Sequence, residues 1–147
     1  MKLLFDASAL LNLIRLLGPE ALSYLRGGYI LTLTPYEAGN ALWREATLMR
    51  RITVNDALLL LDLLESAYKV LNAVSPRSPS PTLKLAHRLR VTYYDASYIA
   101  AAYELDVGLV TDDEKLRRKV NRSRAAILEV LGREVRLLST SDIVRPE

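Results

Sequence analysis

The sequence predicts an α/β fold in which helices cover both sides of a central, mainly parallel sheet. Short apolar or β-branched runs recur along the chain, and helical segments separate them. No hairpin signal joins two successive runs, which favours crossover connections through helices. The 147 residues suffice for one hydrophobic core, so we expect a single domain over residues 1–147.

The predicted strands are four short runs, at residues 2–5, 29–33, 107–110 and 135–138. Helices are expected over residues 8–17, 20–26, 34–50, 53–71, 81–89 and 95–105, and from 112 onward. Ser8 and Ser80 are the expected caps of two of them, and Gly18-Pro19 ends the first. The Ser/Pro-rich stretch 75–81 is expected to be a loop and not a domain linker.

The helix over 53–71 has apolar residues at helical spacing, which predicts one buried face. Leu59 lies among polar neighbours, so we expect it to be exposed, either as part of a partner surface or as an ordinary surface leucine. The predicted buried positions are Val54, Ala57, Leu58, Leu61, Leu64, Tyr68 and Leu71.

Composition excludes several kinds of chemistry. The chain has no Cys and a single His, which rules out disulfides, thiolate zinc sites and cysteine nucleophiles. We expect that histidine, His87, to lie on an amphipathic helix without a chemical role. The longest charge-free stretches run for about ten residues, half the length of a membrane-spanning helix. A cytoplasmic protein is the resulting expectation.

Positive charge is concentrated in one segment. Six cations fall within residues 115–124: Lys115, Arg117, Arg118, Lys119, Arg122 and Arg124. Such a run can neutralise the phosphates of a nucleic acid, or it can form a solvated helix face. Charge alone does not decide between these two interpretations.

Four acidic positions coincide with element junctions. Asp6 ends the first predicted strand, Glu37 lies in the first turn of a helix, Asp95 opens another helix, and Asp112-Asp113 follow a strand. The carboxyl ends of parallel strands meet at one edge of a sheet, so these acids are expected to converge there. A cation is then needed to offset their repulsion, and hard oxygen ligands favour Mg²⁺ or Mn²⁺.

Each acid also has a local structural explanation. Thr34 with Glu37, and Thr111 with Glu114, have the spacing of a capping box, and Asp95 is suited to cap its own helix. No capping rule requires an acid at every junction along one edge, which favours the functional interpretation of the set.

Four segments carry a family resemblance. Residues 3–10 (LLFDASAL), 36–43 (YEAGNALW), 94–100 (YDASYIA) and 109–116 (LVTDDEKL) resemble, in order and spacing, the four motifs of PIN-domain ribonucleases. The chain also falls in the size range of the toxins of VapBC toxin–antitoxin pairs. The resemblance covers nearly the whole sequence and implies a PIN-like three-layer α/β/α sandwich.

The resemblance implies a Mg²⁺- or Mn²⁺-dependent endoribonuclease with the metal ligands Asp6, Glu37, Asp95 and Asp113. The fourth motif usually reads Thr-x-Asp, which selects Asp113 and leaves Asp112 in a supporting role. Small polar side chains that match supporting positions are Ser8, Asn40 and Thr111, for which capping and packing are the alternative roles. The expected RNA-binding cations are Lys115, Arg117, Arg118 and Lys119, with Arg44, Arg50 and Arg51 as further candidates.

In the implied mechanism, a metal-activated water attacks the phosphodiester in line and leaves 5′-phosphate and 3′-hydroxyl ends. The family further implies an antitoxin partner that silences the site, and a homodimer. The alternatives are an RNA-processing nuclease without a toxin role and a non-catalytic module that binds RNA or protein. A receiver domain is disfavoured, because Asp6 stands alone after its strand.

Overall fold

A computed structural model describes residues 2–144 of the chain. A single sheet has the strand order β3-β2-β1-β4-β5, and all of its neighbouring strands are parallel. The strands are β1 (Leu3–Phe5), β2 (Tyr29–Leu31), β3 (Asn72–Val74), β4 (Gly108–Val110) and β5 (Leu137–Leu138). The predicted α/β class with a mainly parallel sheet is confirmed. Strand β3 was not predicted, because this edge strand is largely exposed and lacks an apolar run.

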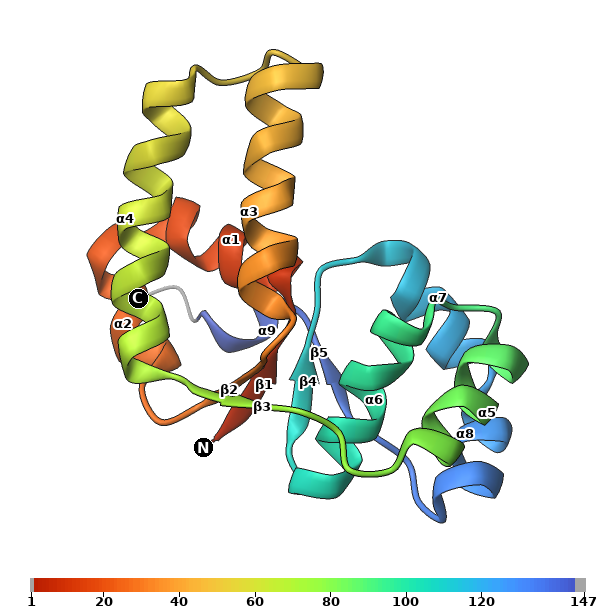
Figure 1. Cartoon of the computed structure of the whole chain (residues 1–147). Helices are drawn as coiled ribbons and strands as arrows, with labels where there is room; N and C mark the ends of the chain where they lie inside the picture. Colours follow the sequence, from red (N-terminus) through yellow and green to blue (C-terminus); the bar gives the residue numbers. More distant parts are fainter. Residues whose placement is uncertain (1, 145–147) are drawn as a thin grey trace.

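Helices cover both faces of the sheet (Figure 1). One face packs against α1 (Ala7–Leu17), α2 (Ala21–Leu25), α3 (Thr34–Trp43) and α4 (Val54–Val70), and a short turn η1 (Gly18–Glu20) joins the first two. The other face packs against α5 (Pro79–Leu89), α6 (Tyr93–Leu105), α7 (Glu114–Arg122) and α8 (Arg124–Leu131). The short helix α9 (Thr140–Ile143) follows β5.

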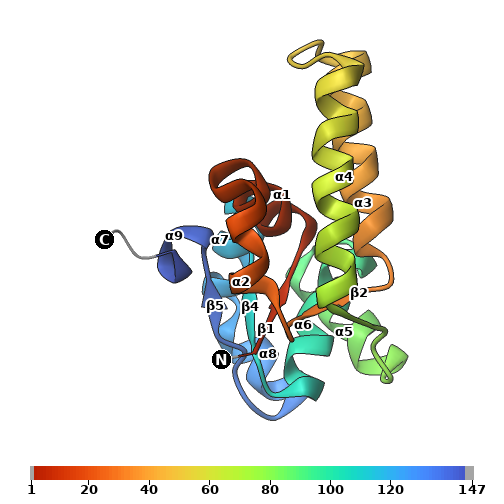
Figure 2. The ribbon, with the colours of Figure 1, turned by 90° about the vertical axis from the view of Figure 1, so that its left-hand side faces the viewer.

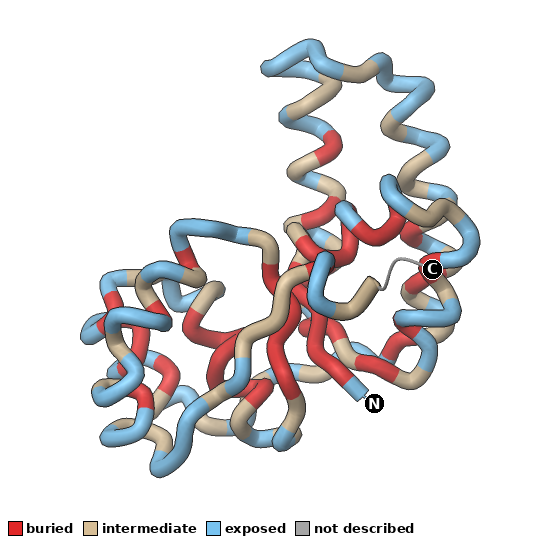
Figure 3. Tube along the Cα trace, turned by 180° about the vertical axis from the view of Figure 1, so that it is seen from behind, coloured by how far each residue is buried: buried red, intermediate tan, exposed pale blue. Residues whose placement is uncertain are grey.

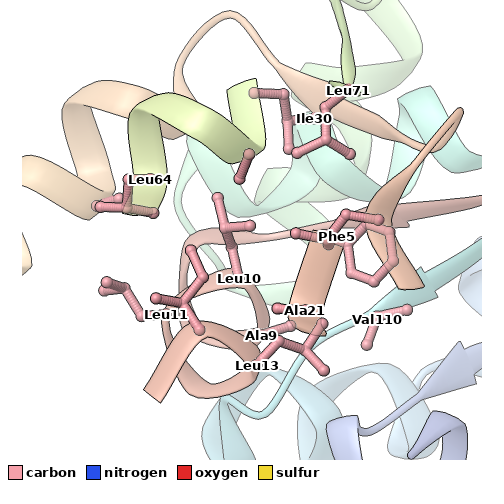
Figure 4. Close-up of a cluster of buried hydrophobic side chains, with 14 of the residues drawn as sticks. Phe5, Ala9, Leu10, Leu11, Leu13, Ala21, Ile30, Leu64, Leu71 and Val110 are labelled. Atoms are coloured by element: carbon pink, nitrogen blue, oxygen red, sulfur yellow. The ribbon is translucent and has the colours of Figure 1, made fainter. Parts of the chain in front are cut away.

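Alternating side chains divide the core into two clusters. Phe5 of β1 points into the cluster with α1, α2 and α4, whereas Leu4 points into the cluster with α5 to α8. Figure 4 shows the first cluster, in which Phe5, Leu10 and Leu64 come from three different elements. The central strands β1 and β4 are thus buried on both faces, which holds their carboxyl ends at a defined position.

A helical hairpin protrudes from this body. Helix α3 continues into a π-helical turn, η2 (Arg44–Leu48), and α4 returns to the sheet (Figures 1 and 2). The burial colouring in Figure 3 shows that the far half of the hairpin is mostly exposed. Val54 and Leu58 are 65% and 52% exposed, so their predicted burial was wrong: their part of α4 extends beyond the body. Leu64 is buried and Leu59 is exposed, as expected.

Two predicted helix caps were wrong in detail. The side chain that accepts a hydrogen bond at the start of α1 belongs to Asp6 and not to Ser8. Helix α5 begins at Pro79 with Ser78 before it, so Ser80 lies within the first turn. A proline does occupy the first position of α5, as expected, but it is Pro79, two residues earlier than predicted.

Among the helices of residues 2–144, none combines the length and the apolar character needed to cross a bilayer.

Candidate active site

The four predicted acidic positions lie at the carboxyl edge of the sheet. β1 leads into Asp6, β4 leads into Thr111 to Asp113, and the first turns of α3 and α6 carry Glu37 and Asp95. In Figure 1 these junctions share the upper end of the sheet. Electrostatic coupling joins Asp6 to Asp113, Asp113 to Asp95, and Asp95 to Glu37. The acids therefore form one connected cluster.

Asp6 is the buried member of the cluster, with only 6% of its surface exposed. One carboxylate oxygen accepts hydrogen bonds from the Ser8 hydroxyl at 2.6 Å and from the Ala9 amide at 2.9 Å. Burial raises the pKa of Asp6 from 3.8 to about 6, although bonds from Ser8, Thr111 and Ala9 act in the opposite direction. The fold thus holds this carboxylate where ionisation is costly.

Glu37 is held by a residue that the sequence did not single out. The Tyr98 hydroxyl, which is buried in α6, donates to Glu37 Oε1 at 2.6 Å and lies 2.7 Å from the Thr34 hydroxyl. Desolvation and the nearby Asp95 charge raise the pKa of Glu37, which is half-buried. Thr34 accepts from the Leu31 amide, so the capping box with Glu37 does not form.

Asp95 lies in the first turn of α6, three residues after the true cap, Thr92. Burial and the charge of Asp113 raise the pKa of Asp95, whereas Thr92, Lys119 and Lys115 act to lower it. Two of the predicted RNA-binding cations therefore lie near the acidic cluster.

Asp112 and Asp113 have different environments although they are adjacent. Asp112 accepts from the Thr140 amide at 2.7 Å, from the Thr140 hydroxyl, and from Asn12 Nδ2 at 2.8 Å. Asp113 is exposed, caps α7 through the Leu116 amide at 3.1 Å, and couples to both Asp6 and Asp95. The Asp112 oxygens are engaged by α1 and α9, whereas the Asp113 carboxylate is exposed and, within residues 2–144, accepts only from the backbone of its own helix.

The predicted supporting hydroxyls occupy bridging positions. Ser8 donates to Asp6 and accepts from the Asp112 amide at 3.1 Å. Buried Thr111 accepts from the Asp113 amide at 3.1 Å, so its predicted capping box with Glu114 does not form. Asn40 lies one turn after Glu37 on α3 and is exposed.

The predicted RNA-binding cations spread over α7. Arg117 donates to the Thr111 carbonyl at 3.1 Å, and Lys119 donates to the Arg90 carbonyl at the end of α5. Lys115 and Arg118 are exposed. His87 is exposed on α5.

Three residues of the site escaped sequence reasoning: Tyr98, Asn12 and Thr140. Tyr98 follows Asp95 by three positions, and that spacing places both on one face of a helix. This was the available signal, but an aromatic residue in an Ala-rich helix is equally typical of core packing. Asn12 and Thr140 carry no such signal, because only the folded chain brings them to Asp112.

Among proteins with similar sequences are ones named ribonuclease or exonuclease. No family model matches the chain. It is 32% identical to the ribonuclease VapC3 of Pyrobaculum aerophilum over 81% of its own length and 95% of that protein. It is 41% identical to the exonuclease VapC9 of the same organism, over 61% of its own length and 65% of that protein.

A third sequence relative and a solved structure are also similar to the chain. The chain is 41% identical to the ribonuclease VapC1 of Mycobacterium tuberculosis over 54% of its length and 58% of that protein. A crystal structure of PAE2754 from Pyrobaculum aerophilum superposes with a TM-score of 0.66 at 33% identity, covering 81% of this chain and 84% of that one. With a relative matched over nearly its whole length and a shared fold, the chain belongs to the VapC family of PIN-domain proteins.

Proposed function

We propose that this chain is a divalent-metal-dependent endoribonuclease, one nuclease domain acting as the toxin of a toxin–antitoxin pair. The observation that carries the proposal is the coupled cluster of Asp6, Glu37, Asp95 and Asp113 at the carboxyl edge of the sheet. The relatives' names, ribonuclease and exonuclease, support nuclease chemistry. An RNA substrate, an antitoxin, a homodimer and a cytoplasmic location belong to the same proposal and rest on family membership.

The donor set fits a hard divalent cation. All four side chains offer carboxylate oxygens, and within residues 2–144 none of them forms an ion pair with Lys or Arg. Across those residues, no group of three or more acids or histidines is close enough to hold a metal ion as it stands. Asp95 is partly exposed and Asp113 is exposed, so the proposal requires these two side chains to rotate toward Asp6 and Glu37 when the metal binds.

Each side chain then has a defined task. Ser8 holds the Asp6 carboxylate and Tyr98 holds that of Glu37, so these two ligands would be oriented before metal binds. Asp95 and Asp113 would complete the set. When bound, Mg²⁺ or Mn²⁺ supplies a Lewis acid that activates water and stabilises charge on the scissile phosphate.

The test uses a circular RNA and a linear RNA with purified protein, in Mg²⁺, in Mn²⁺ and in excess EDTA. Circular RNA has no ends, so its cleavage identifies an endonuclease and excludes a purely exonucleolytic activity. We expect metal-dependent cutting of both RNAs, with 5′-phosphate and 3′-hydroxyl products.

The matched variant is Asp95→Asn, which keeps the size of the side chain and removes its charge. We expect a loss of activity of more than about 100-fold with an unchanged fold, because a metal ligand is weakened. Undiminished cleavage by this variant would rule out the proposed ligand set. Cleavage of the linear RNA alone would replace the endonuclease assignment with an exonuclease.

A further inference from the structure

A groove lies beside the protruding hairpin and reaches from Ser8 on α1 to the turn between η2 and α4. It has a volume of about 250 Å³ and lies between α1 and the segment formed by α3 and η2. At one end it is lined by Ser8, the residue that donates to Asp6. Further along, it is lined by Arg15, Arg44, Glu45, Met49 and Arg51.

The charge of this groove is positive. Glu45 is the one acid that lines it, and Arg15 already pairs with both of its carboxylate oxygens, one of them at 2.9 Å. Arg44 and Arg51 are exposed, and no carboxylate of residues 2–144 lies within 4.0 Å of either guanidinium. Two cations are therefore left to interact with a ligand.

The backbone at this point is unusual. The Met49 amide donates to the Arg44 carbonyl at 2.8 Å, which is the wide spacing of a π turn, and the Arg51 amide donates to the Glu45 carbonyl at 2.9 Å. Between them Arg50 has a φ of 51°, in the left-handed region that favours glycine. Such strained backbone features concentrate at functional sites. Here these backbone features form the turn between Arg44 and Arg51, which both line the groove.

The groove and the acidic cluster beyond Ser8 differ in charge. The cluster repels phosphate until a cation neutralises it, whereas the arginine-lined groove attracts phosphate directly. We propose that the groove binds single-stranded RNA, with Arg44 and Arg51 contacting the phosphates that neighbour the scissile one. This inference rests on the proposed nuclease function and names the path by which its substrate reaches Asp6. It places phosphate contacts on the hairpin, in a part of the chain separate from the basic segment of α7.

The test measures binding separately from cleavage. Affinity of the full chain for a fluorescent single-stranded RNA is measured in EDTA over a range of salt concentrations. The variants are the double substitution Arg44→Ala/Arg51→Ala and a control, Arg26→Ala/Lys69→Ala. The control removes the same charge from exposed positions at the opposite edge of the sheet, before β2 and β3.

Loss of two phosphate contacts reduces the slope of log affinity against log salt by about 1.4 for a single strand. We expect this reduction in the groove variant and an unchanged slope in the control. A third variant, Arg44→Lys/Arg51→Lys, should keep the slope, because it keeps both charges. Thermal unfolding of each variant confirms that the fold is retained.

Equal slopes for the groove variant and the control would overturn the proposal. So would a groove variant that binds RNA normally but loses affinity for a poly-glutamate peptide, since the groove would then serve an acidic protein segment. Failure of the nuclease function itself shows differently, as a wild-type chain that binds RNA but cuts neither the circular nor the linear substrate.

Discussion

The carboxyl edge of the sheet and the tip of the hairpin each hold side chains in an unfavourable environment, but of opposite kinds. The sheet edge buries a carboxylate, whereas the hairpin tip exposes apolar side chains to water. At the sheet edge, Asp6 is buried and is held by the Ser8 hydroxyl and the Ala9 amide. At the tip, apolar Val54 and Leu59 are 65% and 66% exposed. Both arrangements lower stability, the first by desolvating a charge and the second by leaving apolar surface in water. Such local costs mark the places where a sequence serves function and not only folding.

The largest effect that sharpens this comparison is expected within one helix. Leu64, at the root of α4, is fully buried against Leu10 and Leu11, whereas Leu59 lies further out and is exposed. We expect Leu64→Ala to lower the free energy of unfolding by about 2–5 kcal/mol. Leu59→Ala should change it by less than about 0.5 kcal/mol. Urea unfolding of both variants measures the difference.

The control for this prediction is protein concentration. If Leu59→Ala is also strongly destabilising, and its effect grows with concentration, then the tip is buried against a second copy of the chain. The difference in burial between Leu64 and Leu59 would then hold only for a single copy of the chain.

The same helix shows what sequence patterns can and cannot predict. Helical spacing correctly placed Leu64 on the buried face, because periodicity defines the direction of each side chain. It failed at Val54 and Leu58, because periodicity says nothing about how far the rest of the body extends along the helix. The exposed tip follows from the length of α4 relative to the sheet, which is a property of the assembled fold.

The second prediction concerns the cost of burying Asp6. Its pKa is raised from 3.8 to about 6, so its contribution to stability is full below pH 3.8 and is lost as the pH rises through 6. Asp6→Asn removes this titration while an amide oxygen can still accept from Ser8 and Ala9. The variant should therefore gain stability relative to wild type between pH 4 and pH 7, by up to about 3 kcal/mol.

Thermal or urea unfolding in EDTA across this pH range measures the gain. If the stability difference between wild type and Asp6→Asn does not change with pH, then Asp6 is not desolvated in solution. The sheet edge would then carry no cost of burying a charge, and its contrast with the hairpin tip would be lost. Loss of cleavage in the same variant is expected from the metal-ligand role proposed for Asp6.

The acidic cluster was more predictable than its supports. Parallel strands bring their carboxyl ends together by topology, so the convergence of Asp6, Glu37, Asp95 and Asp113 follows from element order. Tyr98 and Thr34, which meet below Glu37, are separated by 64 residues, and their contact depends on how α6 packs against the sheet. Sequence reasoning thus found the charges and missed the hydroxyl that holds one of them.

The smallest expected effect separates the two neighbouring acids of the fourth motif. Asp112 joins α1 to α9 through Asn12 and Thr140, so Asp112→Ala leaves their donors without this acceptor. We expect it to cost about 1–3 kcal/mol of stability, with cleavage retained at temperatures where the variant is folded. Asp113→Asn should show the opposite pattern, because asparagine still caps α7 and only the charge near Asp6 and Asp95 is lost.

Unfolding and cleavage of both variants, measured in parallel, test this division. Its physical basis is that a carboxylate already bound by three donors gains less from a cation than an exposed carboxylate beside two like charges. If Asp112→Ala instead abolishes cleavage without loss of stability, then Asp112 ligates the metal and the bonds to Thr140 must break on metal binding. Helix α9 would then be released from α1 whenever the site is loaded, which hydrogen exchange of the Thr140 amide would detect.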